Sequence, residues 1–341
     1  MRNAVKKAGG AAAAGMAGWS AYSYAKMNKP VPPEEEVKAY TKSLLERVGL
    51  GELCGSWIEE WLDLGDRVLA LYHFKSEPGE PVMVFVPGTS VYALLYTEYM
   101  YKLSRQGFNV VGMDPRGHGM STGRRGVYTL GELVDDVVAV IDHAINIYGD
   151  NVAVSGSSQG GMVALYCAAT EPRLKAAVCH NIIAPDEPDN DRMTRWPGIF
   201  RPLMPFLERL RPLMDSPVGK LMTPVSLYLD LKAETSRLIP DVGRFLKEDP
   251  LVANAVSLSA LHSLASTPLA GKVEEIETPV MVIHAGRDNI FPEDYVRRVY
   301  DRLTCEKELL YLAKAPHLLM TDYVDEILPP ISSWLRRMME R

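Results

Sequence analysis

The stretch NVAVSGSSQGGMVALY, from Asn151 to Tyr166, is the most informative part of the sequence about the fold. Its first residues form a short apolar run, typical of a buried strand, and residues 162–169 predict a helix. Between them, residues 156–160 read Gly-Ser-Ser-Gln-Gly and match the G-x-S-x-G pattern of a nucleophile elbow. At such a corner the central residue takes a strained backbone conformation, so its neighbours must be small. The pattern therefore predicts Ser158 as an exposed nucleophile.

Apolar segments alternate with helical ones on both sides of this corner. The helix that begins after Thr129 has apolar residues at helical spacing and Glu132 as a capping-box partner. The alternation indicates a mostly parallel sheet with helices on both faces, which is an α/β fold. The other expected strands cover residues 67–74, 81–86, 108–113, 174–183, 280–284 and 308–312, and a closing helix covers residues 325–337.

A serine is a poor nucleophile without a base, and the chain has seven histidines. His317 follows the last expected strand, at the edge where active sites gather in such sheets. Asp288 follows the strand 280–284, so the chain order is serine, acid, histidine. We expect Ser158, Asp288 and His317 to form a catalytic triad in which the carboxylate orients the imidazole. The other histidines are expected in strands (His73, His180, His284), on helices (His143 at the surface, and His262) and in a turn (His118).

Two backbone N–H groups are candidates for stabilising an oxyanion. Gln159 follows the nucleophile at a helix N-terminus, where N–H groups are free and the dipole is positive. The loop Pro87-Gly88-Thr89 follows the strand 81–86, and its glycine lets the backbone approach a substrate. The N–H groups of Gln159 and Thr89 are therefore the expected oxyanion hole.

Composition limits the partners. The chain of 341 residues has a formal charge of −6 and 47% hydrophobic residues, which is enough for a sizeable core and gives no basic patch for nucleic acid. The expected chemistry requires no metal and no organic cofactor, and the oligomeric state stays open. Scattered cysteines without CxxC or zinc-ligand spacing favour a reducing compartment such as the cytoplasm: Cys54, Cys167, Cys179 and Cys305.

The N-terminus has an unusual composition. Three basic residues, Arg2, Lys6 and Lys7, precede an Ala/Gly-rich stretch over residues 8–25. This stretch lacks the Leu, Ile and Val density of a spanning helix, so a signal, a membrane-associated anchor and an ordinary surface helix all stay open. A proline-rich linker follows, and we expect residues 1–33 to form a segment separate from the folded core.

Three stretches carry a resemblance to a known family. They are residues 114–126 (DPRGHGMSTGRRG), residues 156–160 (GSSQG) and residues 249–252 (DPLV). Together they resemble the α/β-hydrolase superfamily, and within it the monoacylglycerol lipase/lysophospholipase-like group, also described as serine aminopeptidase-like. The resemblance covers residues 57–334. One departure is Pro87-Gly88, where relatives often have His-Gly; the glycine and the following N–H are retained.

The resemblance also implies an inserted helical cap. About a hundred residues separate the strands 174–183 and 280–284, far more than an ordinary connection. We assign residues 184–264 to the cap, and residues 34–183 and 265–341 to the core. The cap holds an apolar run broken by prolines at residues 196–206. Further leucines and methionines continue it: Leu207, Leu210, Leu213, Met214, Leu221 and Met222. Some of these side chains are expected to line an acyl groove or to touch a membrane.

The function implied is a serine hydrolase that cleaves small-molecule or lipid carboxyl esters through an acyl-enzyme. The same triad also serves acyl transfer, thioester hydrolysis and peptide hydrolysis, and the sequence does not separate these. A non-catalytic binding protein of this fold is a further alternative, against which the complete Ser, Asp and His set argues.

Overall fold

The computed structural model describes residues 2–231 and 234–340. In this part of the chain an eight-stranded sheet has the order β1-β2-β4-β3-β5-β6-β9-β10. Its first two pairings, β1–β2 and β2–β4, are antiparallel, and the rest are parallel. The strands are β1 (Ile58–Asp63), β2 (Val68–Phe74), β3 (Val82–Val86), β4 (Asn109–Asp114), β5 (Val152–Ser157), β6 (Ala176–His180), β9 (Val280–Ala285) and β10 (Lys307–Leu312).

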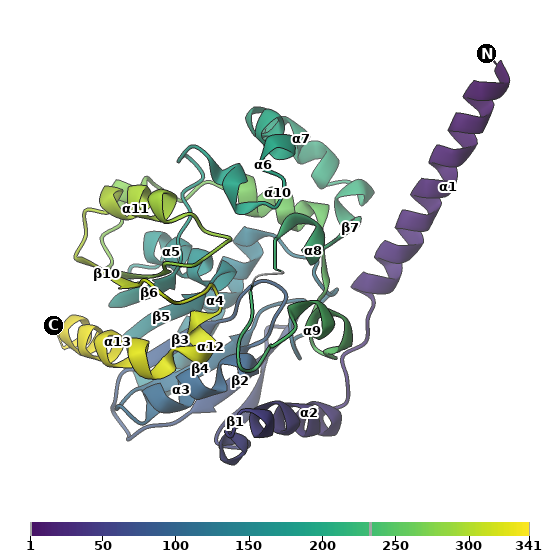
Figure 1. Cartoon of the computed structure of the whole chain (residues 1–341). Helices are drawn as coiled ribbons and strands as arrows, with labels where there is room; N and C mark the ends of the chain where they lie inside the picture. The colour runs from purple at the N-terminus through teal and green to yellow at the C-terminus, as the bar shows by residue number, and fades with distance from the viewer. Residues whose placement is uncertain (1, 232–233, 341) are drawn as a thin grey trace.

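Helices cover both faces of this sheet (Figure 1), and an apolar layer packs on each face. One layer contains side chains of α4, α5 and α11, and the other contains side chains of α3 and α13. The helices are α1 (Arg2–Met27), α2 (Glu34–Arg47), α3 (Thr97–Ser104), α4 (Leu130–Tyr148), α5 (Gln159–Thr170), α6 (Pro197–Phe200), α7 (Leu207–Met214), α8 (Val225–Tyr228), α9 (Val242–Glu248), α10 (Leu258–Ser266), α11 (Glu293–Arg302), α12 (Leu319–Asp322) and α13 (Val324–Met339).

The predicted α/β class is confirmed, with three local differences. The sequence analysis missed β1, whose residues IEEWLD carry three acidic side chains and lie at the solvated edge of the sheet. The strand expected over residues 174–183 is shorter, because β6 ends at His180 and Asn181 turns away with φ 68°. The cap also contains a two-stranded sheet of β7 (Met222–Pro224) and β8 (Ala255–Ser257), which the prediction of a helical cap did not include.

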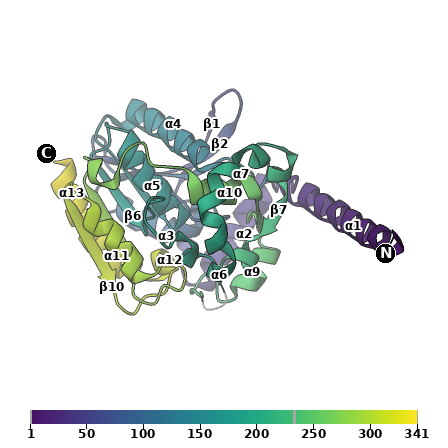
Figure 2. The same ribbon diagram turned by 90° about the horizontal axis from the view of Figure 1, so that it is seen from above.

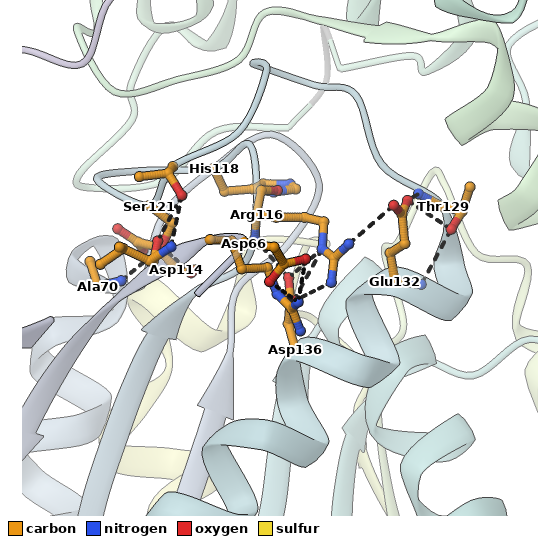
Figure 3. A network of polar contacts seen from close by, with 12 residues as sticks. Asp66, Ala70, Asp114, Arg116, His118, Ser121, Thr129, Glu132 and Asp136 are labelled. Atoms are coloured by element: carbon orange, nitrogen blue, oxygen red, sulfur yellow. Dashed lines mark hydrogen bonds and ion pairs between the residues drawn. The ribbon is translucent and has the colours of Figure 1, made fainter. Parts of the chain in front are cut away.

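The capping box predicted at the start of α4 is confirmed. The Thr129 hydroxyl accepts the N–H of Glu132 at 3.2 Å, and the Glu132 carboxylate accepts the N–H of Thr129 at 2.7 Å (Figure 3). The Arg116 guanidinium binds Asp136 at 2.6 Å and Glu132 at 3.1 Å. These contacts fix the N-terminal half of α4 against the loop that follows β4.

That loop is the GHGxSxG-like segment, and its contacts hold the backbone in a tight turn. The Asp114 carboxylate accepts the N–H groups of Ala93 at 2.8 Å and Met120 at 2.9 Å. Ser121 donates to the Asp114 carbonyl and accepts the N–H of Ala70 at 2.8 Å (Figure 3). A Cβ at Gly119, where φ is 46°, would lie 1.9 Å from the Asp114 carboxylate, so only glycine fits there. The motif therefore shapes the turn.

The cap lies between β6 and β9 in sequence, and Figure 2 shows α6, α7 and α10 over one end of the core. Helix α1 contacts its small sheet. The Trp19 indole donates to the Met222 carbonyl at 2.9 Å, and Ser23 accepts the N–H of Met222 at 2.8 Å. From there α1 extends away from the body of the molecule (Figure 1). The domain boundaries at residues 33, 183 and 264 stay predictions.

Among residues 2–231 and 234–340, no helix combines the length and the apolar character needed to cross a bilayer. The side chains of Arg2, Lys6 and Lys7, which motivated the idea of an anchor, lie outside the part that the structure describes. Contact of the N-terminal segment with a membrane surface therefore stays a prediction.

Candidate active site

The corner between β5 and α5 has the geometry that the sequence pattern predicts. Ser158 lies there with φ 56° and ψ −116°, a strained backbone conformation for a residue with a side chain. A Cβ at Gly156 would lie 2.0 Å from the carbonyl oxygen of Gly160, and a Cβ at Gly160 would lie 2.2 Å from that of Val86. Both glycines are therefore required by close backbone approach.

The structure brings together the three residues predicted as a triad. The Ser158 hydroxyl donates to Nε2 of His317 at 3.0 Å, and Nδ1 of His317 donates to the Asp288 carboxylate at 2.8 Å. Ser158 comes after β5, Asp288 after β9 and His317 after β10, so all three residues lie at the carboxyl edge of the sheet. This arrangement lets His317 take a proton from the serine while Asp288 fixes the ring.

The Asp288 carboxylate is fully buried and receives four hydrogen bonds. One oxygen accepts the N–H groups of Ile290 and Phe291, both at 2.8 Å. The other accepts the amide of Asn181 at 2.9 Å as well as His317. Burial alone would raise the pKa of Asp288, but the neighbouring imidazole and these donors hold it below its ordinary value. The carboxylate is therefore ionised and held in place.

His317 is buried against Phe291, whose ring stacks on the imidazole at 5.6 Å with an interplanar angle of 6°. Burial by itself lowers the pKa of His317, but the negative charges of Asp288 and Glu234 outweigh it and raise the pKa above the usual 6.5. The surroundings thus favour the imidazolium that forms when the serine is deprotonated.

Two contributors to this site were missed by the sequence analysis. Glu234, from the cap, accepts the backbone N–H of His317 at 3.0 Å and the amide of Asn289 at 3.2 Å. Asn181 donates to Asp288 and accepts Nδ1 of His284 at 2.7 Å. No motif marks either residue, since Asn181 fell inside an expected strand and Glu234 inside the cap.

Most of the remaining histidines lie where the sequence predicts them. His180 and His284 are buried and hydrogen-bonded in strands, and burial lowers the pKa of His180 to about 3, so that imidazole is neutral. His118 lies in its predicted turn, with Nδ1 3.0 Å from the Arg116 carbonyl. The surface position predicted for His143 is wrong, because its side chain is only 21% exposed and its Nε2 is buried.

The two predicted oxyanion residues lie beside the nucleophile. Thr89, Gln159 and Ser158 line the same cavity. Gln159 is the first residue of α5, and its side-chain oxygen accepts the Tyr128 hydroxyl at 3.0 Å. That bond fixes the side chain, and the backbone N–H belongs to the first helical turn, where it has no acceptor within the helix.

Two cavities meet at Ser158. The larger, of about 320 Å³, lies between α5 and the cap, and most of its lining is apolar. Leu210 and Met214 of the cap line it, as expected for some of the cap's apolar residues. The smaller, of about 80 Å³, lies on the side of Gly88 and Glu234. A site of this form suits a substrate with a long apolar part and a smaller second part.

One group of side chains here is close enough to hold a metal ion. Ligand atoms of His180, Asp288 and His317 lie within 4.8 Å of one another. Both nitrogens of His317 are already hydrogen-bonded, to Asp288 and to Ser158. This group is therefore arranged for proton transfer.

Known proteins of this fold include esterases and lipases. Residues 77–323 match the family described as serine aminopeptidase, S33. An AB hydrolase superfamily protein, YisY, of Bacillus subtilis is 25% identical over 255 residues, 70% of this chain and 85% of its own. The bifunctional esterase/perhydrolase DCH of Acinetobacter calcoaceticus is 24% identical over 263 residues, 75% of this chain and 92% of its own.

A solved structure shows the same fold. The monoacylglycerol lipase of Paleococcus ferrophilus superposes with a TM-score of 0.63 at 24% identity, over 79% of this chain and 99% of that one. The family match spans well over half of the present chain and includes the elbow, Asp288 and His317. The chain belongs to the serine aminopeptidase (S33) family of α/β hydrolases, a group with esterase and lipase members.

Proposed function

We propose that this protein hydrolyses carboxyl esters with an apolar acyl chain, using Ser158 as the nucleophile. The observation that carries the proposal is the hydrogen-bonded chain from Ser158 through His317 to Asp288, which opens into an apolar cavity of about 320 Å³. The Ser158 hydroxyl thus has a base beside it and faces a cavity that can bind an apolar acyl chain.

The reaction follows from this geometry. His317 accepts the proton of Ser158 as the hydroxyl oxygen attacks the ester carbonyl. The oxyanion that forms is stabilised by the N–H groups of Gln159 and Thr89. The imidazolium then protonates the leaving alcohol, and the acyl group stays on the serine. Water, deprotonated by the same imidazole, releases the acid and restores the enzyme.

Each of the two cavities would hold one part of the substrate. The larger is lined by aliphatic and methionine side chains such as Met162, Leu210 and Met214, which suit a flexible acyl chain. The smaller is also mostly apolar, but Glu234 and Thr321 add polar groups to its lining, and its size suits a short leaving alcohol. A monoacylglycerol or a similar lipid ester has both parts.

A fluorophosphonate probe tests the nucleophile. We expect it to label the wild-type protein and the Ser155→Ala variant, and to leave Ser158→Ala unlabelled. Ser155 is a matched control because it lies in the same strand but bonds to Tyr99 in the core. Labelling of Ser158→Ala at the wild-type rate would contradict the assignment.

The substrate class needs a separate measurement. We expect turnover of p-nitrophenyl esters to rise from acetate to longer acyl chains as the large cavity fills. The same acyl group presented as a thioester or as an anilide separates ester hydrolysis from thioesterase and peptidase activity. An added alcohol that captures the acyl group in place of water would indicate acyl transfer.

A further inference from the structure

A second group of two histidines and one carboxylate lies away from Ser158. It consists of Glu60 on β1, His73 on β2 and His143 on α4, and we call it the Glu60 cluster. Strands β4 and β3 separate β2 from the nucleophile's strand β5. At about 4.8 Å per strand, β2 and β5 are roughly 14 Å apart. The cluster is therefore independent of the triad.

Strand geometry brings these three side chains together. Leu69 and Leu71 of β2 pack in the apolar layer that contains α4, and by alternation His73 lies on the same face. On β1, Leu62 packs against that layer, so Glu60, two residues earlier, shares its face. His143 reaches the same point from α4.

The distances within the cluster are those of ion pairs, but the ring nitrogens lack good hydrogen-bond geometry. Nε2 of His73 lies 2.8 Å from one Glu60 oxygen, and Nε2 of His143 lies 2.9 Å from the other. Both nitrogens are nevertheless buried atoms without a hydrogen-bond partner among the described residues. Neither ring is therefore oriented to donate an N–H to the carboxylate. A buried imidazole nitrogen without a partner costs free energy, and here two occur beside one carboxylate.

The other ring nitrogen of His73 has a polar neighbour. Its Nδ1 lies 2.9 Å from the Tyr148 hydroxyl, which can either donate or accept a hydrogen bond. With a metal ion on Nε2, Nδ1 would carry the proton and donate it to the phenol oxygen. Metal-binding histidines commonly donate their second ring N–H to a fixed acceptor in this way.

We propose that the Glu60 cluster binds a divalent transition-metal ion, for which Zn²⁺ is a suitable probe. Two imidazole nitrogens and a carboxylate are a donor set that Zn²⁺ accepts. Zinc–ligand bonds of about 2.0–2.1 Å in a tetrahedron place donor atoms about 3.3 Å apart. The two nitrogen–oxygen separations are 2.8 and 2.9 Å, so a small outward shift of the side chains would admit the ion. The Glu60 side chain is 37% exposed, which leaves room for a water as fourth ligand. The ion would join the edge strand β1 to β2 and α4.

The test is zinc binding by the full-length protein after removal of metal with a chelator. Calorimetric titration with zinc sulfate should show that the wild type binds one equivalent. In a separate thermal unfolding experiment, zinc should raise the midpoint of the wild type by several degrees, since an ion that binds only the folded state stabilises it. His143→Ala and Glu60→Gln should lose that equivalent and the rise. Tyr148→Phe should bind about 10–100-fold more weakly.

Glu59→Gln is the matched control, because it removes the same charge one residue away. Glu59 lies on the opposite face of β1, where it accepts the Trp57 indole N–H at 3.2 Å. The Glu59→Gln variant should bind zinc with the same stoichiometry and affinity as the wild type. Absence of binding by the wild type would overturn the proposal. So would wild-type binding by folded His143→Ala and Glu60→Gln, because the ion would then occupy another site, such as the triad. Circular dichroism establishes that each variant is folded.

Discussion

The triad and the Glu60 cluster contain the same kinds of residue, yet their hydrogen bonding differs. Each nitrogen of His317 has a partner, Asp288 on one side and Ser158 on the other. In the Glu60 cluster, Nε2 of His73 and Nε2 of His143 have none among the described residues, although a carboxylate lies beside both. Nearness of histidine and carboxylate therefore does not define a function by itself. In the triad both ring nitrogens of His317 are aligned with hydrogen-bond partners, whereas neither Nε2 of the Glu60 cluster is.

The largest effect is expected at Asp288. Asp288→Asn keeps the shape but reverses the polarity at His317, so the ring adopts the wrong tautomer and cannot accept the serine proton. We expect the kcat for ester hydrolysis to fall by roughly 10⁴-fold. Asp63→Asn, in the edge strand β1, is the control and should keep the wild-type kcat. A fall of less than tenfold in Asp288→Asn would show that the triad does not operate as proposed.

A smaller effect is expected at Asn181, which holds Asp288 and His284. Loss of its hydrogen bond to a charged group corresponds to about 1.5–3 kcal/mol, or roughly 10–100-fold in kcat. Asn181→Ala and Asn181→Gly both remove the amide, but only glycine suits the φ of 68° without strain. We expect both variants to lose activity to a similar extent. A loss confined to Asn181→Ala would instead attribute the effect to backbone strain.

The smallest effect is expected at Glu234, and it appears in the pH profile. His317 must be neutral to act as a base, so kcat/KM falls as the pH drops through its pKa. Burial lowers the pKa of His317, but the negative charges of Asp288 and, to a smaller extent, Glu234 raise it above its ordinary value. Glu234→Gln should therefore move the acid limb of kcat/KM to lower pH. Glu248→Gln, whose carboxylate pairs with Arg244 on α9, should leave that limb in place. An unchanged limb in Glu234→Gln would exclude electrostatic tuning by the cap.

Asp288 and Asn181 test whether the saturated hydrogen bonds of the triad maintain its chemistry. Glu234 tests whether the cap contributes charge to it. Zinc binding tests whether the unpartnered nitrogens of His73 and His143 act as ligands.

The α/β class and the three triad candidates follow from local sequence patterns and from the order of the strands. The elbow is a local sequence signal, because its five residues are consecutive and lie between an apolar strand and a helix. Gly156 is required by backbone approach within the elbow, and Gly160 by the approach of Val86 at the end of β3. Asp288 and His317 each follow an apolar strand directly, and the carboxyl ends of parallel strands meet at one edge of the sheet. Local patterns and strand polarity were therefore sufficient to place these side chains near Ser158.

Which distant side chains meet depends on the tertiary structure. Glu234 reaches His317 from the cap, and no periodicity in the sequence predicts that contact. The Glu60 cluster depends on the antiparallel pairing of β1 with β2 and on the rotation of α4 over the sheet. A shift of one residue in that pairing would turn Glu60 to the other face. Register and helix rotation are set by packing of the whole core, so they were not available from local pattern.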